Sequence, residues 1–366
     1  MSSNLSCGIV GLPNVGKSTL FNALTRKSIP SENYPFCTID PNIGIVNVPD
    51  PRLAVLAVQS KSAKIVPATV TFVDIAGLVK GASEGAGLGN QFLSHIRETD
   101  AIVQVVRCFQ DDNVIHVSGR LDPIEDIEVI NLELILADLQ MVENTLQRME
   151  KQAKGKKELL PTIELLKKAQ QHLNQNLPLR KCALTPKELE IASLYPFLTL
   201  KKVLYAANVG EKDLPLMENA FVQRVREYAV QEGSRVIPIC ARLEEELSQL
   251  SPEEGVQYLQ SMGLQESGLD RLIKAAFELL DLITYITTGE LETRAWTIHN
   301  GTNAAAAAGK IHSDLEKGFI RAEVVTYSDM VQYAGRVGAR EVGKARSEGR
   351  EYIVKDGDVI LFYHSN

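Results

Sequence analysis

The sequence is poor in cysteine and has no long run of apolar residues. Its five cysteines are scattered singly over 366 residues, without a C-x-x-C pair. This pattern argues against a disulfide framework or a cysteine-based metal cluster, and it is typical of free thiols in a reducing compartment. No apolar stretch approaches the ~18–20 residues of a membrane span, and no signal peptide precedes the first strand-like segment. We therefore expect a soluble cytoplasmic protein with no membrane partner.

The sequence also lacks an excess of positive charge. Its formal net charge of −7 argues against a protein that coats nucleic acid, and DNA is not an expected partner, although a local basic face is compatible with this charge. Apolar residues make up 45% of the chain, enough for ordinary buried cores. A chain of 366 residues exceeds one typical core, so two or three domains are expected.

The N-terminal segment contains a phosphate-binding motif. Residues 11–18 read Gly-Leu-Pro-Asn-Val-Gly-Lys-Ser, which is the pattern G-x4-G-K-[ST] between a strand-like run and a helix-like segment. The glycines allow a tight turn, and N–H groups at the start of the helix would face the phosphates. Lys17 would place its charge on the β- and γ-phosphates, and Ser18 would ligate Mg²⁺. The residues expected to hold the nucleotide here are Asn14, Val15, Gly16, Lys17, Ser18 and Thr19.

Two further elements fit a nucleotide-dependent switch. Residues 70–77 read as a strand that ends in D-x-x-G, so Asp74 would hold Mg²⁺ and the Gly77 amide would bond the γ-phosphate. Thr38, in a loop upstream, is the candidate second hydroxyl ligand of Mg²⁺, the alternative being an ordinary loop threonine. Such loops contact the γ-phosphate only while it is present, so hydrolysis would release them.

Three patterns of apolar and polar residues along the chain predict three domains. Short strands alternate with helical segments over residues 5–126 and 203–283, as in a doubly wound α/β sheet. Residues 127–202 carry two heptad-like apolar stripes with a basic, glycine-bearing break at 151–157, which predicts an inserted antiparallel helical hairpin, a coiled coil. Residues 284–366 read as a small α+β module. The first stripe is Ile127, Ile130, Leu134, Ala137 and Met141, and strands of the last part are expected at 294–298, 320–325 and 359–363.

The residues that would select the purine depart from the guanine-reading pattern N-K-x-D. The equivalent strand end reads Asn208-Val209-Gly210-Glu211, without the lysine and with the carboxylate on a longer side chain. A site that loses its hydrogen bonds to a base can forfeit about 10⁴-fold discrimination. We therefore predict an adenine pocket that includes Glu211, in which backbone groups and the Asn208 amide hold the base and Val209 packs on it. The alternative is that Asp213 restores a guanine pocket through a register shift.

The catalytic elements are incomplete by the standard of Ras-like GTPases. Leu78 follows the D-x-x-G element, where those enzymes have the glutamine that orients the attacking water. Leucine cannot bond water, so slow hydrolysis is expected unless a loop, a partner or a monovalent cation positions it. His116 is the candidate catalytic residue beside Lys17, the alternative being a structural histidine. Asn14 is either a potassium ligand or a residue that stabilises the loop.

These elements and several other blocks resemble the YchF subfamily of Obg-related P-loop NTPases. The resemblance spans essentially the whole chain. The matching blocks are residues 11–24, 35–42, 72–78, 88–92, 105–109, 208–211, 294–298, 309–321 and 352–358.

The resemblance implies a Rossmann-like, OBG-type G domain interrupted by a coiled-coil hairpin, and a C-terminal TGS domain of the β-grasp type. It also implies hydrolysis of ATP in preference to GTP, association with the ribosome, and a role in regulating translation or stress responses. His116 falls where the family has a histidine proposed to position water, and Leu78 agrees with the hydrophobic replacement of the glutamine in this family.

Three function classes stay open from the sequence. The first is an ATP-driven switch that docks on the ribosome, either on its large subunit or on the whole particle, through rRNA contacts. The second is a small-molecule kinase, for which we see neither a lid with catalytic arginines nor an acceptor pocket. The third is a GTP-hydrolysing ribosome-assembly factor. The candidate RNA contacts, each of which could instead belong to a solvated helix face, are Lys151, Lys154, Lys156, Lys157, Arg336, Arg340, Lys344 and Arg346.

Overall fold

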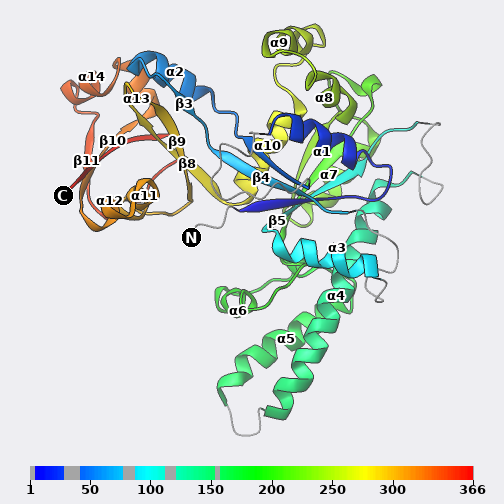
Figure 1. The fold of residues 1–366 in the computed structure, drawn as a ribbon. Coiled ribbons are helices and arrows are strands. Elements are labelled where there is room, and N and C mark those ends of the chain that lie inside the picture. The colour runs from blue at the N-terminus through cyan, green and yellow to red at the C-terminus, as the bar shows by residue number, and fades with distance from the viewer. Residues whose placement is uncertain (1–4, 29–41, 77–86, 112–120, 153–156, 366) are drawn as a thin grey trace. The chain divides into compact units, whose positions relative to one another are not determined.

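The computed structural model describes residues 5–28, 42–76, 87–111, 121–152 and 157–365 (Figure 1). The chain divides into two compact units. The first unit comprises residues 1–45 and 71–272, and the second comprises residues 46–70 and 273–366. None of the described helices combines the length and the apolar character that crossing a membrane requires.

A six-stranded sheet forms the centre of the first unit. In spatial order its strands are β2 (Ile43–Asn47), β4 (Thr69–Asp74), β1 (Ser6–Val10), β5 (Ala101–Arg107), β6 (Lys202–Asn208) and β7 (Arg235–Ile239). The described pairings from β4 to β7 are parallel. Every residue of β1 and β5 is buried, as is usual for parallel strands covered on both faces. The predicted α/β sheet is therefore present, and the carboxyl ends of β1, β4 and β6 meet at one edge, where such sheets bind ligands.

Two helices of this sheet domain, α7 and α9, begin at side-chain caps. Asn219 accepts hydrogen bonds from the Phe221 and Val222 N–H groups at the start of α7, and Ser251 with Glu254 forms a capping box on α9. The helices are α1 (Lys17–Arg26), α3 (Gly87–Glu98), α7 (Ala220–Val230), α8 (Ala241–Leu247), α9 (Pro252–Ser261) and α10 (Gly268–Leu279).

Two helices, α4 (Pro123–Gln152) and α5 (Leu160–Leu173), pack on each other within residues 127–202 and share a core with α6 (Pro186–Ala192). The predicted first stripe is not their common seam. Four of its five residues, Ile127, Ile130, Leu134 and Ala137, lie in the core that includes the sheet. The α4 side of the shared core is instead formed by Ile135, Val142 and Leu146. The apolar pattern predicted the helix correctly, but it did not predict whether the apolar stripe packs on the sheet or on a second helix, which depends on the tertiary structure.

Buried polar contacts hold the segment 127–202 together and join it to the sheet domain. Asp138 on α4 accepts hydrogen bonds from the Leu198 N–H (2.9 Å), the Thr199 N–H (2.8 Å) and the Thr199 hydroxyl (2.6 Å). Arg180 donates to Glu232 through Nε at 3.1 Å, and both side chains are buried. The three hydrogen bonds partly compensate the burial of the Asp138 carboxylate, and they fix the middle of α4 to the segment that precedes β6.

The second unit contains a mixed sheet. In spatial order its strands are β11 (Arg346–Glu348), β10 (Phe319–Thr326), β12 (Asp358–His364), β8 (Leu282–Thr288), β9 (Thr293–His299) and β3 (Ile65–Val66). The three strands predicted in the C-terminal segment are present as β9, β10 and β12. Figure 1 shows helices on both sides of this sheet, namely α2 (Pro51–Ser60) and α13 (Tyr327–Gln332) on one side and α11 (Ala304–Ile311) and α12 (Ser313–Lys317) on the other. The short helix α14 (Arg336–Glu341) follows α13.

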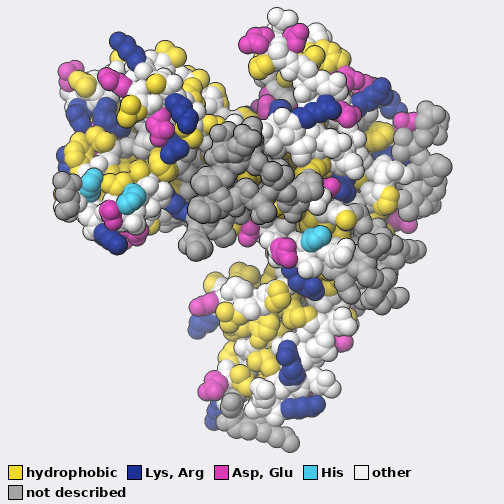
Figure 2. Space-filling model, in the orientation of Figure 1, with side chains coloured by type: hydrophobic (Ala, Val, Ile, Leu, Met, Phe, Trp, Pro, Cys, Tyr) yellow, Lys and Arg dark blue, Asp and Glu magenta, His cyan; other side chains and the backbone are white. Residues whose placement is uncertain are grey.

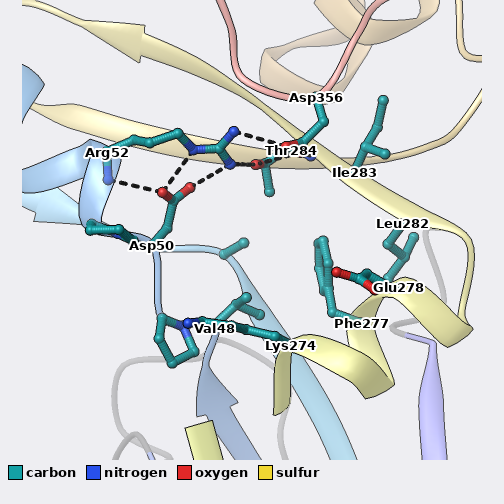
Figure 3. Close-up of a pocket in the computed structure, with 13 residues that line it drawn as sticks. Val48, Asp50, Arg52, Lys274, Phe277, Glu278, Leu282, Ile283, Thr284 and Asp356 are labelled. Atoms are coloured by element: carbon teal, nitrogen blue, oxygen red, sulfur yellow. Dashed lines mark hydrogen bonds and ion pairs between the residues drawn. The ribbon is translucent and has the colours of Figure 1, made fainter. Parts of the chain in front are cut away.

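Residues 46–70 pack with this second unit, although the sequence boundaries placed them within 5–126. Strand β3 pairs in parallel with β9, and the Arg52 guanidinium donates to both Asp50 oxygens and to Asp356 Oδ2, each at 2.8 Å. Figure 3 shows Arg52 between these two carboxylates, at the wall of a cleft of about 460 Å³. Because Asp356, the second partner of Arg52, and β9, the partner of β3, lie more than 200 residues away, local sequence patterns could not reveal this assignment.

Candidate nucleotide site

The loop after β1 has the backbone that a phosphate cradle needs. Asn14 and Gly16 adopt left-handed conformations, with φ of 64° and 95°. A Cβ on Gly16 would lie 2.1 Å from the Asn208 Nδ2 atom, so only glycine fits there. Helix α1 begins at the next residue without a side-chain cap, which leaves the amides of its first turn directed at the loop. This arrangement is suited to binding an anion.

Lys17 and Asp74 come together at this edge of the sheet, as the motifs predicted. The Lys17 Nζ and Asp74 Oδ1 atoms are 2.5 Å apart, and both side chains are largely shielded from solvent. Ser18 is exposed beside Lys17 on the first turn of α1. A carboxylate and a hydroxyl are oxygen donors of the kind that Mg²⁺ prefers, and Mg²⁺ usually takes its other ligands from phosphates and water. The chemistry of these two side chains therefore fits Mg²⁺.

A cleft of about 350 Å³ adjoins the phosphate loop, within the size range of small-molecule sites. Figure 1 labels helices α1 and α8, which contribute residues to its lining. Phe109, just after β5, contributes an aromatic wall, and the Arg107 guanidinium lies 4.7 Å from its ring centroid. The lining residues are Gly16, Thr19, Phe109, Gln110, Asp111, Asn208, Val209, Gly210, Glu211, Lys212, Cys240, Ala241 and Arg242. The sequence analysis did not predict three of these lining residues, Phe109, Cys240 and Arg242. They follow the carboxyl ends of β5 and β7, where ligands bind in such sheets, and this position was a usable signal.

Asn208 holds the phosphate loop and helix α8 together. Its Nδ2 donates to the Val15 carbonyl at 2.9 Å, and its Oδ1 accepts from the Ala241 N–H at 3.0 Å. The side chain is only 4% exposed. The predicted contact of this amide with the base stays a prediction, and one Nδ2 hydrogen is left to make it.

The other predicted base contacts differ in their surroundings. Val209 lines the cleft but is 2% exposed, so it can offer only a small surface to a base. Glu211 is half exposed, and its Oε2 lies 3.4 Å from Arg242 Nη1. Asp213, the alternative guanine reader, accepts hydrogen bonds from Gly210 N and Asn219 Nδ2 and is not among the described residues that line the cleft.

Four residues with a predicted role lie outside the described residues. They are the Mg²⁺ candidate Thr38, the γ-phosphate contact Gly77, its neighbour Leu78 and the water-positioning candidate His116.

The C-terminal arginines proposed as RNA contacts are engaged within the second unit. Arg336 and Arg340 both pair with Glu323, at 3.1 and 2.9 Å, and Arg346 donates to the Tyr352 hydroxyl at 3.1 Å. A single carboxylate on β10, that of Glu323, thus pairs with two of the four basic residues predicted in this segment. Lys154 and Lys156 lie outside the described residues, and the exposed lysines of the set are Lys151, Lys157 and Lys344.

Helix α8, which lines the cleft with its first residues, carries a buried acid. Glu244 is 1% exposed and accepts a hydrogen bond from the Gly268 N–H at 2.8 Å, at the start of α10. Burial raises the pKa of this carboxyl from 4.5 to about 7, against the opposing effect of Lys27.

We expect Glu244 to make the protein less stable as pH rises from 4.5 to 7. In this window the folded state keeps a proton that the unfolded chain releases, so the free energy of unfolding falls by roughly 3 kcal/mol. Glu244→Gln should remove most of this slope, measured by urea unfolding at pH 5 and pH 8. Glu245→Gln, on the same helix, is the matched control and should keep the slope. An equal slope in wild type and Glu244→Gln would contradict the assignment.

Comparisons with known proteins agree with this geometry. Residues 6–157 match a family model described as a 50S ribosome-binding GTPase, and residues 282–365 match the model YchF-GTPase_C, described as a protein of unknown function. The chain is 53% identical to proteins named ribosome-binding ATPase YchF from Haemophilus influenzae and Bacillus subtilis, over 97% and 98% of this chain and 98% of each relative. The solved structure of a Schizosaccharomyces pombe YchF GTPase superposes with a TM-score of 0.87 at 38% identity, covering 99% of this chain and 98% of that chain.

Proposed function

The chain belongs to the YchF family, and we propose that it is a ribosome-associated ATPase that prefers ATP to GTP and regulates translation or stress responses. As a member with an intact P-loop it is an ATP hydrolase. Its domains are proposed as an OBG-type G domain (5–126 and 203–283), a coiled-coil insertion (127–202) and a TGS domain of the β-grasp type (284–366). The long paired helices support the insertion, and the mixed sheet with its helices supports the last part.

The phosphate groups of ATP would be held by the loop from Asn14 to Thr19. Lys17 would leave Asp74 for the β- and γ-phosphates, where its charge stabilises the transferring phosphoryl group. Bound Mg²⁺, held by Ser18 and Asp74 with Thr38 as a further ligand, would neutralise phosphate charge. Gly77 would bond the γ-phosphate, and His116 would orient the attacking water. Asn14 would act as a potassium ligand, and a comparison of ATP turnover in K⁺ and in Na⁺ would test this role.

The adenine preference rests on one observation above all: the N–H of Ala241, a residue that lines the cleft, donates a buried hydrogen bond to Asn208 Oδ1. A guanine carbonyl would need a donor at the purine edge, and this amide is engaged. Phe109 provides a surface on which either purine can stack. The missing lysine of N-K-x-D points in the same direction.

Titration calorimetry with Mg²⁺ and each nucleotide tests this proposal. We expect ATP to bind at least about tenfold more tightly than GTP, since unpaired polar groups penalise the wrong base. The family model described as a 50S ribosome-binding GTPase favours the second candidate, a GTP-hydrolysing ribosome-assembly factor. Tighter binding and faster turnover of GTP would establish that candidate instead.

Ribosome association would use the exposed lysines at the free end of the paired helices, Lys151 and Lys157, against rRNA. Figure 2 shows Lys and Arg side chains over the part of the molecule that α4 and α5 form in Figure 1. Contacts between lysines and phosphates release counterions. Binding to purified ribosomes should therefore weaken steeply when the salt concentration rises from about 50 to about 200 mM. Association that is indifferent to salt would argue against an rRNA contact.

A further inference from the structure

An arginine that none of the sequence motifs includes stands at the rim of the purine cleft. Arg242 is the second residue of α8 and lines the cleft together with Glu211. Its Nη1 lies 3.4 Å from Glu211 Oε2, and its Nε lies 3.9 Å from Glu246 Oε1. The Tyr258 hydroxyl donates to the other oxygen of Glu246 at 3.0 Å. The guanidinium thus lies between two carboxylates, of which only Glu211 faces the cleft.

We propose that Arg242 is a specificity-determining residue, which favours adenine by occupying one oxygen of Glu211. A carboxylate reads guanine by accepting two N–H groups of the base edge, one on each oxygen. Arg242 takes Oε2, so guanine would lose one of these two bonds. Adenine presents an amino group as its donor at this edge, and the remaining oxygen of Glu211 is sufficient for it. This inference rests on the proposed binding of ATP.

The backbone of Arg242 is held in place by its neighbours, whereas its side chain is exposed. Ala241, the preceding residue, is bonded to Asn208, and Glu244, two residues later, is bonded to Gly268. Both contacts are buried, so the start of α8 keeps its place beside the cleft. The Arg242 side chain itself is 72% exposed and that of Glu211 is 50% exposed. Exposed ion pairs are weak and are screened by salt, so we expect an effect of only about threefold to fivefold.

The test compares the ratio of GTP to ATP dissociation constants in wild type and Arg242→Met, by calorimetry with Mg²⁺ at low salt. Arg242→Met should tighten GTP binding and lower this ratio by about threefold to fivefold, with ATP affinity almost unchanged. Arg242→Lys should keep part of the preference, because it retains the charge but not the planar fork. Glu246→Gln is the matched control, since it removes the other partner of Arg242 and should leave the ratio as in wild type.

A double variant isolates the pair. If Arg242 acts by occupying Glu211, Arg242→Met should have no further effect on the ratio in a Glu211→Gln background. An unchanged ratio in Arg242→Met, with wild type still preferring ATP, would overturn the role of Arg242 and leave the ATPase assignment intact. Weaker ATP binding in Arg242→Met would also overturn it, because the arginine would then contact the nucleotide itself. A wild-type preference for GTP would instead overturn the proposed adenine site.

Discussion

Replacing Lys17 with methionine should lower kcat/KM for ATP hydrolysis by about 10³-fold or more, because the site loses the cation placed to stabilise the transferring phosphoryl group. The structure adds a second reason. Lys17 Nζ lies 2.5 Å from Asp74 Oδ1, so the variant also leaves the proposed Mg²⁺ ligand without its counter-charge in the empty protein. Steady-state phosphate release with ATP as the only nucleotide measures the effect.

Lys27→Met is the matched control for this substitution. Lys27 follows the last residue of the same helix and pairs with Asp270 at 3.0 Å, so the variant removes an ion pair of similar length from the other end of α1. A half-exposed pair of this kind contributes little, and turnover should stay within about twofold of wild type. If Lys17→Met kept more than about a tenth of wild-type turnover, direct contact with the phosphates would be the wrong role for Lys17.

Asn208→Ala should weaken ATP binding by about 10²-fold and lower the free energy of unfolding by about 2–6 kcal/mol, because each of the two stranded groups costs about 1–3 kcal/mol. The side chain gives a hydrogen bond to the Val15 carbonyl and receives one from the Ala241 N–H. Without it, a buried acceptor and a buried donor lose their partners, and the phosphate loop is no longer tied to α8. Calorimetry and urea unfolding measure the two effects separately.

Asn219→Ala separates a loss of stability from a loss of the site. Asn219 caps α7 by accepting from the Phe221 and Val222 N–H groups at 3.0 Å, and its Nδ2 also donates to the Cys108 carbonyl and to Asp213. Its loss should therefore cost about 2–3 kcal/mol. It makes no described hydrogen bond to the phosphate loop. ATP affinity should therefore stay near that of wild type. Equal losses of ATP affinity in the two variants would show that Asn208 acts only through general stability.

The arrangement of the candidate phosphate site was predictable because its signals are local. G-x4-G-K-[ST] fixes a turn and the start of a helix within eight residues, and the rule that parallel strands bind ligands at their carboxyl ends brings Asp74 and Asn208 to the same edge. The order of the strands in the sheet, and so which of these side chains lie next to each other, was not predicted from the sequence. The strands of the C-terminal segment were also predictable, since their apolar alternation is a local pattern.

The remaining features depend on partners that are distant in sequence. Whether Ile130 faces another helix or the sheet is not encoded in the period of its stripe. Arg336 and Arg340 resemble a basic face until Glu323, on another element, pairs with both. Asn208 was expected to bind the base, whereas its hydrogen bonds show that it also supports the loop. Such roles follow from tertiary contacts, which single-sequence patterns do not report.

The assignment of residues 46–70 to the second unit limits how the chain can be divided. A fragment that begins at residue 284 would lack β3, α2 and the Arg52 side chain that holds Asp356. One sheet edge would be left unpaired and apolar surface uncovered, both of which promote aggregation. Cutting after residue 283 would likewise leave α2 attached to a protein that no longer contains its partners. An autonomous C-terminal fragment would need residues 46–70 joined to 273–366 by a new linker.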